Sequence, residues 1–207
     1  SEPIPSLRGL MLNPMGQAEA SKVAHYGGAD YAWNPARFEK VSNWEASIRS
    51  LVKDDEELRN AMRTFAIHSE SGIELKETDE LKPLFDTFKS SYSASGELPS
   101  VTGQLVTEMQ KIYDACVLLR TMEHSGDSDH VLFYKETKYW IAKLQSMSNI
   151  ILKSLTLLQS GENSQWTDFL VAKEEYAKIH TDADFFVPAL EGSGTSTEKK
   201  SYEVTPS

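Results

Sequence analysis

A short apolar run, Leu7–Leu12, ends directly at Asn13 and Pro14, and this junction constrains the fold more than any other feature of the sequence. Pro14 disfavours the α-helical region for Asn13 but suits the first position of a helix, so a strand and a helix can join here without a loop. A parallel strand of this kind is buried between neighbouring strands, and no other segment of the 207 residues has the pattern of a partner strand. The sequence therefore predicts a strand–helix unit whose partner strands lie upstream of this chain.

Beyond residue 40 the pattern is helical, with apolar residues recurring at helical spacing between short polar turns. The sequence predicts helices around Trp44–Val52, over Val101–Met122 and over about Ser128–Gln159. Three further helices are predicted from their first residues: one after a capping box formed by Asp54 and Glu57, one after a capping Thr78 with Pro83 in its first turns, and one after a capping Ser164. The stretch Ser91–Ser100 is predicted to be a loop. This pattern indicates an antiparallel helical bundle that follows an αβ remnant.

Composition excludes several classes of function. Acidic residues outnumber basic ones by 31 to 21, which gives a formal net charge of −10 and disfavours binding to nucleic acid. No stretch approaches the roughly 18 apolar residues of a membrane span. The single cysteine, Cys116, excludes an internal disulfide, and its place on an apolar helical stripe predicts a buried side chain rather than a nucleophile.

The residues around the junction resemble glycoside hydrolase family 84, the retaining β-N-acetylglucosaminidases that include O-GlcNAcases and enzymes often called hyaluronidases. The resemblance is tight over about residues 7–50 and rests on Asn13-Pro14-Met15, Gln17–Lys22, Ala29–Pro35 and Asn43-Trp44-Glu45. It implies a mainly α fold, in which an antiparallel helical bundle is preceded by the last strand–helix unit of a (β/α)8 barrel. The implied domains are residues 1–38 as the end of the barrel, 39–190 as a post-catalytic helical bundle and 191–207 as a flexible tail or linker.

Gly27-Gly28 depart from the family pattern, where bulkier residues are expected. Each glycine inside a helix costs about 1 kcal/mol relative to alanine. We therefore expect the helix either to be distorted at this point or to pack very close to a neighbour.

Asn13 is the single candidate substrate-binding residue. It falls at the carboxyl end of the predicted strand, where (β/α)8 barrels build their active sites, and its amide can both donate and accept hydrogen bonds. The resemblance implies that Asn13 binds the sugar in the first subsite. The alternative is that Asn13 only shapes the turn into the helix.

The family uses a substrate-assisted mechanism, an exception to the usual pair of enzymic carboxylates, in which two adjacent aspartates assist the acetamide of the sugar. Asp54-Asp55 imitates that pair, but these residues open a helix and the family pair lies upstream. We therefore expect no catalytic residue, no cofactor and no metal in this chain. His124, Asp127, Asp129 and His130 could ligate a metal by residue type, but their spacing predicts a polar turn with a helix cap instead.

The sequence leaves three functions open. In the first, the chain braces or extends the barrel of an enzyme that removes terminal β-linked N-acetylglucosamine from a glycan or glycoprotein, and is not catalytic alone. In the second, it is a non-enzymatic helical module for interaction or self-association. Exposure of Leu10, Leu12, Val23 and Tyr31 would favour the first. A third interpretation, a carbohydrate-binding module, requires exposed aromatic side chains, with Trp140 and Trp166 as the candidates.

Overall fold

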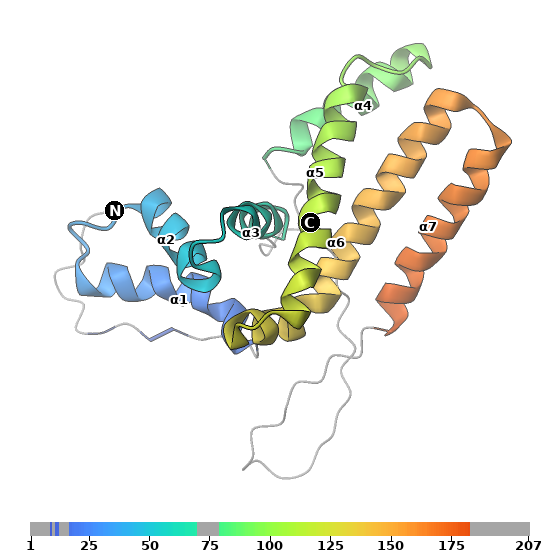
Figure 1. Ribbon diagram of the computed structural model, residues 1–207. Helices are drawn as coiled ribbons and strands as arrows, with labels where there is room; N and C mark the ends of the chain where they lie inside the picture. Colours follow the sequence, from blue (N-terminus) through green and yellow to red (C-terminus); the bar gives the residue numbers. More distant parts are fainter. Residues whose placement is uncertain (1–8, 10, 13–16, 70–78, 183–207) are drawn as a thin grey trace, which may run out of the picture.

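The computed structural model describes residues 9, 11–12, 17–69 and 79–182, and within these ranges it is mainly helical (Figure 1). The helices are α1 Ala18–Trp33, α2 Lys40–Val52, α3 Glu56–His68, α4 Lys82–Ser95, α5 Thr102–Arg120, the short 3-10 helix η1 Thr121–His124, α6 Ser128–Ser160 and α7 Asn163–Asp182. The described residues contain no strand. Leu7, Arg8 and Leu10 of the predicted strand lie outside them. The predicted helical character is thus confirmed.

The three longest helices run side by side and antiparallel, with α6 between α5 and α7 (Figure 1). Helix α3 packs across α5, and α4 contacts α5 near the opposite end from η1. Helices α1 and α2 form a pair that contacts α6. This arrangement leaves α1 at one edge of the molecule, next to the beginning of α6.

The apolar core lies where α2, α3, α5 and α6 meet. Its side chains are almost fully buried and include Ile48, Met62, Met109, Ile112, Leu119, Ile141 and Leu144. Cys116 belongs to the same core, and its burial raises the pKa of the thiol to about 12. The prediction that Cys116 is a buried apolar residue is therefore confirmed.

Helix α6 was predictable to within one residue, because strong local signals mark both of its ends. Asp127 caps the first turn by accepting a hydrogen bond from the backbone N–H of Asp129 at 2.9 Å. Gly161 ends the helix in the left-handed conformation with φ 64°. Pro83 also lies where predicted, in the first turn of α4.

Three predicted boundaries are wrong. Asp55, not Asp54, caps α3, because Asp55 has the extended backbone and accepts from the N–H of Leu58 at 2.8 Å. Helix α4 continues to Ser95 through the first half of the predicted loop, and it ends only at Gly96, with φ 70°. Helix α7 begins at Asn163, which places Ser164 inside the first turn. The predicted cap Thr78 lies outside the described residues.

Candidate functional site

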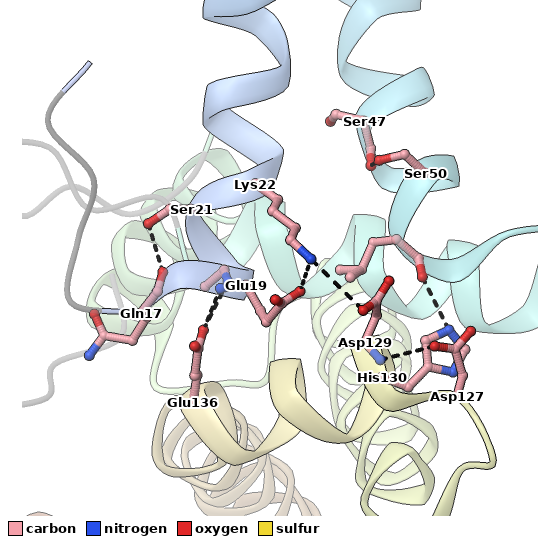
Figure 2. A network of polar contacts seen from close by, with 12 residues as sticks. Gln17, Glu19, Ser21, Lys22, Ser47, Ser50, Asp127, Asp129, His130 and Glu136 are labelled. Atoms are coloured by element: carbon pink, nitrogen blue, oxygen red, sulfur yellow. Dashed lines mark hydrogen bonds and ion pairs between the residues drawn. The ribbon is translucent and has the colours of Figure 1, made fainter. Parts of the chain in front are cut away.

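The beginning of α1 is the described segment that immediately follows the Asn13-Pro14 junction, and a side chain from α6 caps it (Figure 2). Glu136 Oε2 accepts hydrogen bonds from the backbone N–H groups of Glu19 at 2.8 Å and Ala20 at 3.1 Å. Gln17, at the N-cap position, makes no side-chain capping bond of its own. Because the free N–H groups at a helix start carry partial positive charge, a carboxylate placed there satisfies them and is stabilising. The bundle therefore supplies the cap that α1 lacks locally.

A second contact ties the same turn of α1 to α6. The ammonium group of Lys22 pairs with Glu19 and lies 3.9 Å from Asp129 Oδ1 (Figure 2). The hydrogen bond that Lys22 donates to the Glu19 carboxylate is the largest cause of the raised pKa of Lys22. Ser21, the one buried residue of α1, bonds through its hydroxyl to the carbonyl of Gln17 at 2.7 Å. Charge and hydrogen bonding hold the start of this helix, together with Ala20, which packs partly buried against the apolar core.

The turn that leads into α6 uses the polar side chains that sequence analysis considered as metal ligands. Asp127 caps α6 and pairs with Lys53, and this hydrogen bond holds the pKa of Asp127 below its ordinary value. His130 lies 3.1 Å from the carbonyl of Leu51 and 3.1 Å from the Ser125 hydroxyl. The described residues contain no group of side chains arranged to hold a metal ion. The predicted helix cap is confirmed at Asp127, whereas His124 ends η1 and Asp129 and His130 lie in the first turn of α6.

Asn43 of α2, one of the residues on which the family resemblance rests, packs closely against α1. Asn43 Nδ2 donates to Asp30 Oδ2 at 2.9 Å, and a Cβ added to Gly27 would lie 3.1 Å from Asn43 Oδ1. A Cβ added to Gly28 would lie 2.7 Å from Leu12 Cδ1. Close packing, the second of the two expectations for these glycines, is therefore the one that the structure supports.

The remaining surface of α1 carries exposed apolar side chains. Trp33, the last residue of α1, is 90% exposed, and Met11 and Leu12, several positions before the helix, are 95% and 39% exposed. Val23 and Tyr31 are half-buried, and Leu10 lies outside the described residues. A helix with one buried residue and an exposed tryptophan has apolar surface without a partner among the described residues.

Asn13 also lies outside the described residues, so its role stays a prediction. Among the tryptophans, Trp44 and Trp140 pack partly buried against the core, whereas Trp166 is 51% exposed. Sequence reasoning missed Glu136, because the residue that it caps is 117 positions away and no local motif marks the pair. None of the described helices combines the length and apolar character needed to cross a bilayer.

Comparisons with known proteins agree with this arrangement. Residues 3–67 match the family model described as beta-N-acetylglucosaminidase, a range that includes α1 and α2 and nearly all of α3. The fold is similar to the solved structure of CpGH84D, with a TM-score of 0.65, 24% identity, and coverage of 82% of this chain and 29% of that one. CpGH84B gives a TM-score of 0.61 and 23% identity over 81% of this chain and 28% of that one.

A mutant of the Thermobaculum terrenum O-GlcNAc hydrolase gives a TM-score of 0.62 and 21% identity, over 84% of this chain and 36% of that one. This chain thus spans between 28% and 36% of the length of the structures that it matches. The family match at residues 3–67 and the shared fold together confirm the resemblance of this chain to the helical region of glycoside hydrolase family 84.

Proposed function

We propose that this chain is the C-terminal part of a retaining, substrate-assisted glycoside hydrolase that removes terminal β-linked N-acetylglucosamine from glycans or glycoproteins. Residues 1–38 would close the catalytic barrel, residues 39–190 would form the helical bundle that braces it, and residues 191–207 would be a tail or linker. The catalytic aspartates would come from the upstream barrel, and this chain would be inactive alone.

The observation that carries the proposal is the incomplete burial of α1. The helix is fixed to the bundle through Glu136, Asn43 and the ion pair of Lys22 with Asp129. Its last residue, Trp33, is nevertheless 90% exposed. An upstream barrel that packed against the exposed residues would bury them, and the bundle contacts would then hold the barrel and the bundle together.

Asn13 would contribute directly to substrate binding in the complete enzyme. It precedes Gln17, the N-cap of α1, by four positions. Because Glu136 fixes the first turn of α1, the bundle would also limit how far the junction can move. A neutral amide there could hold a sugar hydroxyl without adding charge.

The test compares hydrolysis of an aryl N-acetyl-β-glucosaminide by this chain and by the natural chain extended upstream. We expect the short chain to be inert and the long chain to be active. In the long chain, Asn13→Ala should lower kcat/KM by at least about tenfold, since a lost hydrogen bond to a sugar leaves a polar group unpaired. Asn60→Ala, an exposed change on α3, is the matched control and should leave the activity unchanged. An inactive long chain with a native circular dichroism spectrum would contradict the proposal.

A non-enzymatic interaction or dimerisation module is the second candidate, and a specific surface favours it. The α6–α7 hairpin exposes Leu158, Trp166, Leu170 and Val171. Exposed apolar side chains that gather on one part of a surface favour association. Sedimentation velocity would detect self-association, which Leu170→Glu should abolish. A monomer at every concentration, with or without this change, would rule out self-association through this surface.

A further inference from the structure

A groove with a volume of about 420 Å³ lies between α5, α6 and α7, and nothing in the proposed function uses it. Its lining includes Tyr113 and Arg120 from α5, Gln145, Ser146 and Asn149 from α6, and Glu175 from α7. Ser146 is ten positions beyond Glu136 on the same helix, which corresponds to about 15 Å along its axis. The groove is therefore separate from the start of α1.

The Ser146 hydroxyl is the feature that points to a ligand. Its residue is 8% exposed, and the oxygen finds no hydrogen-bond partner among the described residues. Buried polar groups in native proteins almost always have a partner, because leaving one unpaired costs free energy. The oxygen itself has less than 1 Å² of exposed surface, so a group in the groove would bond to this hydroxyl after the serine side chain turned to another rotamer.

The chemistry of the lining selects a class of ligand. Arg120 donates to Gln145 Oε1 at 3.3 Å and carries further donors, while the amide of Asn149 both donates and accepts. Glu175 adds an acceptor, and half-buried Tyr113 adds an aromatic ring. Such a mixture suits sugar hydroxyl groups, which donate and accept in the same way and whose ring carries apolar C–H faces.

Local charge argues against a strongly ionic ligand. The cations Arg120 and Lys178 stand beside the anions Glu174 and Glu175, and Lys178 pairs with Glu174 at 3.1 Å. The four charges cancel, so neither an anion nor a cation is attracted strongly. A neutral, polyhydroxylated molecule remains the best match.

We propose that this groove binds a neutral saccharide of one or two residues, as a sugar site distinct from the Asn13 junction. Its volume falls within the range of about 300–1,000 Å³ that ligand pockets occupy. The inference concerns the bundle alone and does not require that the chain belong to an active hydrolase.

The experiment uses the 207-residue chain with N,N′-diacetylchitobiose as the probe and follows backbone amides by ¹H–¹⁵N NMR. We expect saturable shifts at Gln145, Ser146 and Asn149 at probe concentrations up to about 20 mM, an affinity typical of a few exchanged hydrogen bonds. Glycerol at the same concentration is the control for solvent effects and should produce no saturable shift.

Two variants test the geometry without disturbing the apolar core. Ser146→Ala and Asn149→Ala should each weaken binding about tenfold, because each removes one hydrogen-bonding group from the groove. Gln104→Ala, an exposed change on α5 away from the groove, should bind as the parent chain does. The proposal is overturned if no saturable shift occurs, if the shifts map instead to exposed Trp166, or if both groove variants bind normally.

Discussion

Helices α1 and α5 are similar in length but differ in how they are held. Helix α5 buries seven residues, among them Leu105, Met109, Ile112 and Leu119 in contact with the rest of the bundle. Helix α1 buries only Ser21 and depends on Glu136, Lys22 and Asn43 for its attachments. Apolar burial supplies most of the favourable free energy of folding, and polar contacts mainly specify geometry.

This difference teaches that the bundle positions α1 but leaves part of its apolar surface exposed. Its polar contacts hold its first turns against α6. Its exposed residue Trp33 provides apolar area that can be buried only by something outside the described residues. The predictions below test this contrast, beginning with the largest expected effect.

Alanine substitutions in α5 and in α1 should lower the free energy of unfolding by very different amounts. Leu119→Ala in α5 should lower the free energy of unfolding by about 2–5 kcal/mol, because it opens a cavity in the core. Trp33→Ala in α1 should change it by less than about 0.5 kcal/mol in this chain. Urea unfolding monitored by circular dichroism measures both. A large cost for Trp33→Ala would show that α1 is already packed on both sides.

Removal of the tertiary cap should loosen α1 selectively. Glu136→Ala should destabilise α1 by about 0.5–2 kcal/mol, the usual cost of losing a helix cap. Hydrogen exchange of the α1 amides would then accelerate, while exchange in α5 would stay unchanged. Glu136→Gln keeps an acceptor oxygen, so the stability of α1 in this variant should lie between that in the parent chain and that in Glu136→Ala. The matched control is Lys135→Ala, at an exposed neighbouring position. Equal acceleration in α1 and α5 would contradict a local role for Glu136.

Lowering the pH should reduce the free energy of unfolding of the apolar core, because His68 is buried there. This residue is buried between α3 and α5, and burial lowers the pKa of its ring below the ordinary value of 6.5, while Glu108 at 3.4 Å opposes that shift. The unfolded chain therefore binds more protons than the folded chain between the two pKa values. Stability is retained above pH 6.5, falls as the pH drops through this interval, and levels off below the folded pKa.

Thermal melting of variants between pH 7.5 and 5 checks this dependence on His68. His68→Gln should flatten the slope over the interval below pH 6.5. His124→Gln is the matched control, because the His124 side chain is 86% exposed. A slope that is unchanged in His68→Gln would assign the pH dependence to other groups.

The smallest expected effect concerns Gly28. Alanine at this position gains up to about 1 kcal/mol of helix propensity, but its Cβ would meet the end of the Leu12 side chain at 2.7 Å. In this chain Leu12 is 39% exposed and can move, so we expect a slight stabilisation. In the upstream-extended chain, where a strand would hold Leu12, the same change should destabilise. Equal melting shifts in both chains would show that the strand does not fix Leu12.

Sequence patterns predicted the helical bundle well because its signals are local. The ends of α6 followed from Asp127 and the turn at Gly161, and the apolar stripe of α5 followed from its periodicity. The error at Asp54 arose because two adjacent aspartates offer equivalent caps, and only the turn after Lys53, with φ 56°, selects Asp55. Helix α4 extended past its predicted end because Ser and Tyr residues tolerate a helix until Gly96 stops it.

The site was less predictable, because its contacts join distant segments. Glu136 and Glu19 are 117 positions apart, and the groove gathers Tyr113, Ser146 and Glu175 from three helices. No spacing rule connects such residues before the helices are packed. The resemblance at the Asn13 junction agrees with the family model that matches residues 3–67, but the capping of α1 by the bundle required the structure.

The length of α6 has a mechanical consequence. Its 33 residues correspond to about 50 Å of continuous helix, from the turn beside α1 to the tip of the α6–α7 hairpin. A continuous helix of this length sets a constant spacing between a partner bound at α1 and a partner bound at the tip of the α6–α7 hairpin. Insertion of a single residue into its middle would rotate one end against the other by about 100°, and would thus change the relative direction of the two ends more than their separation.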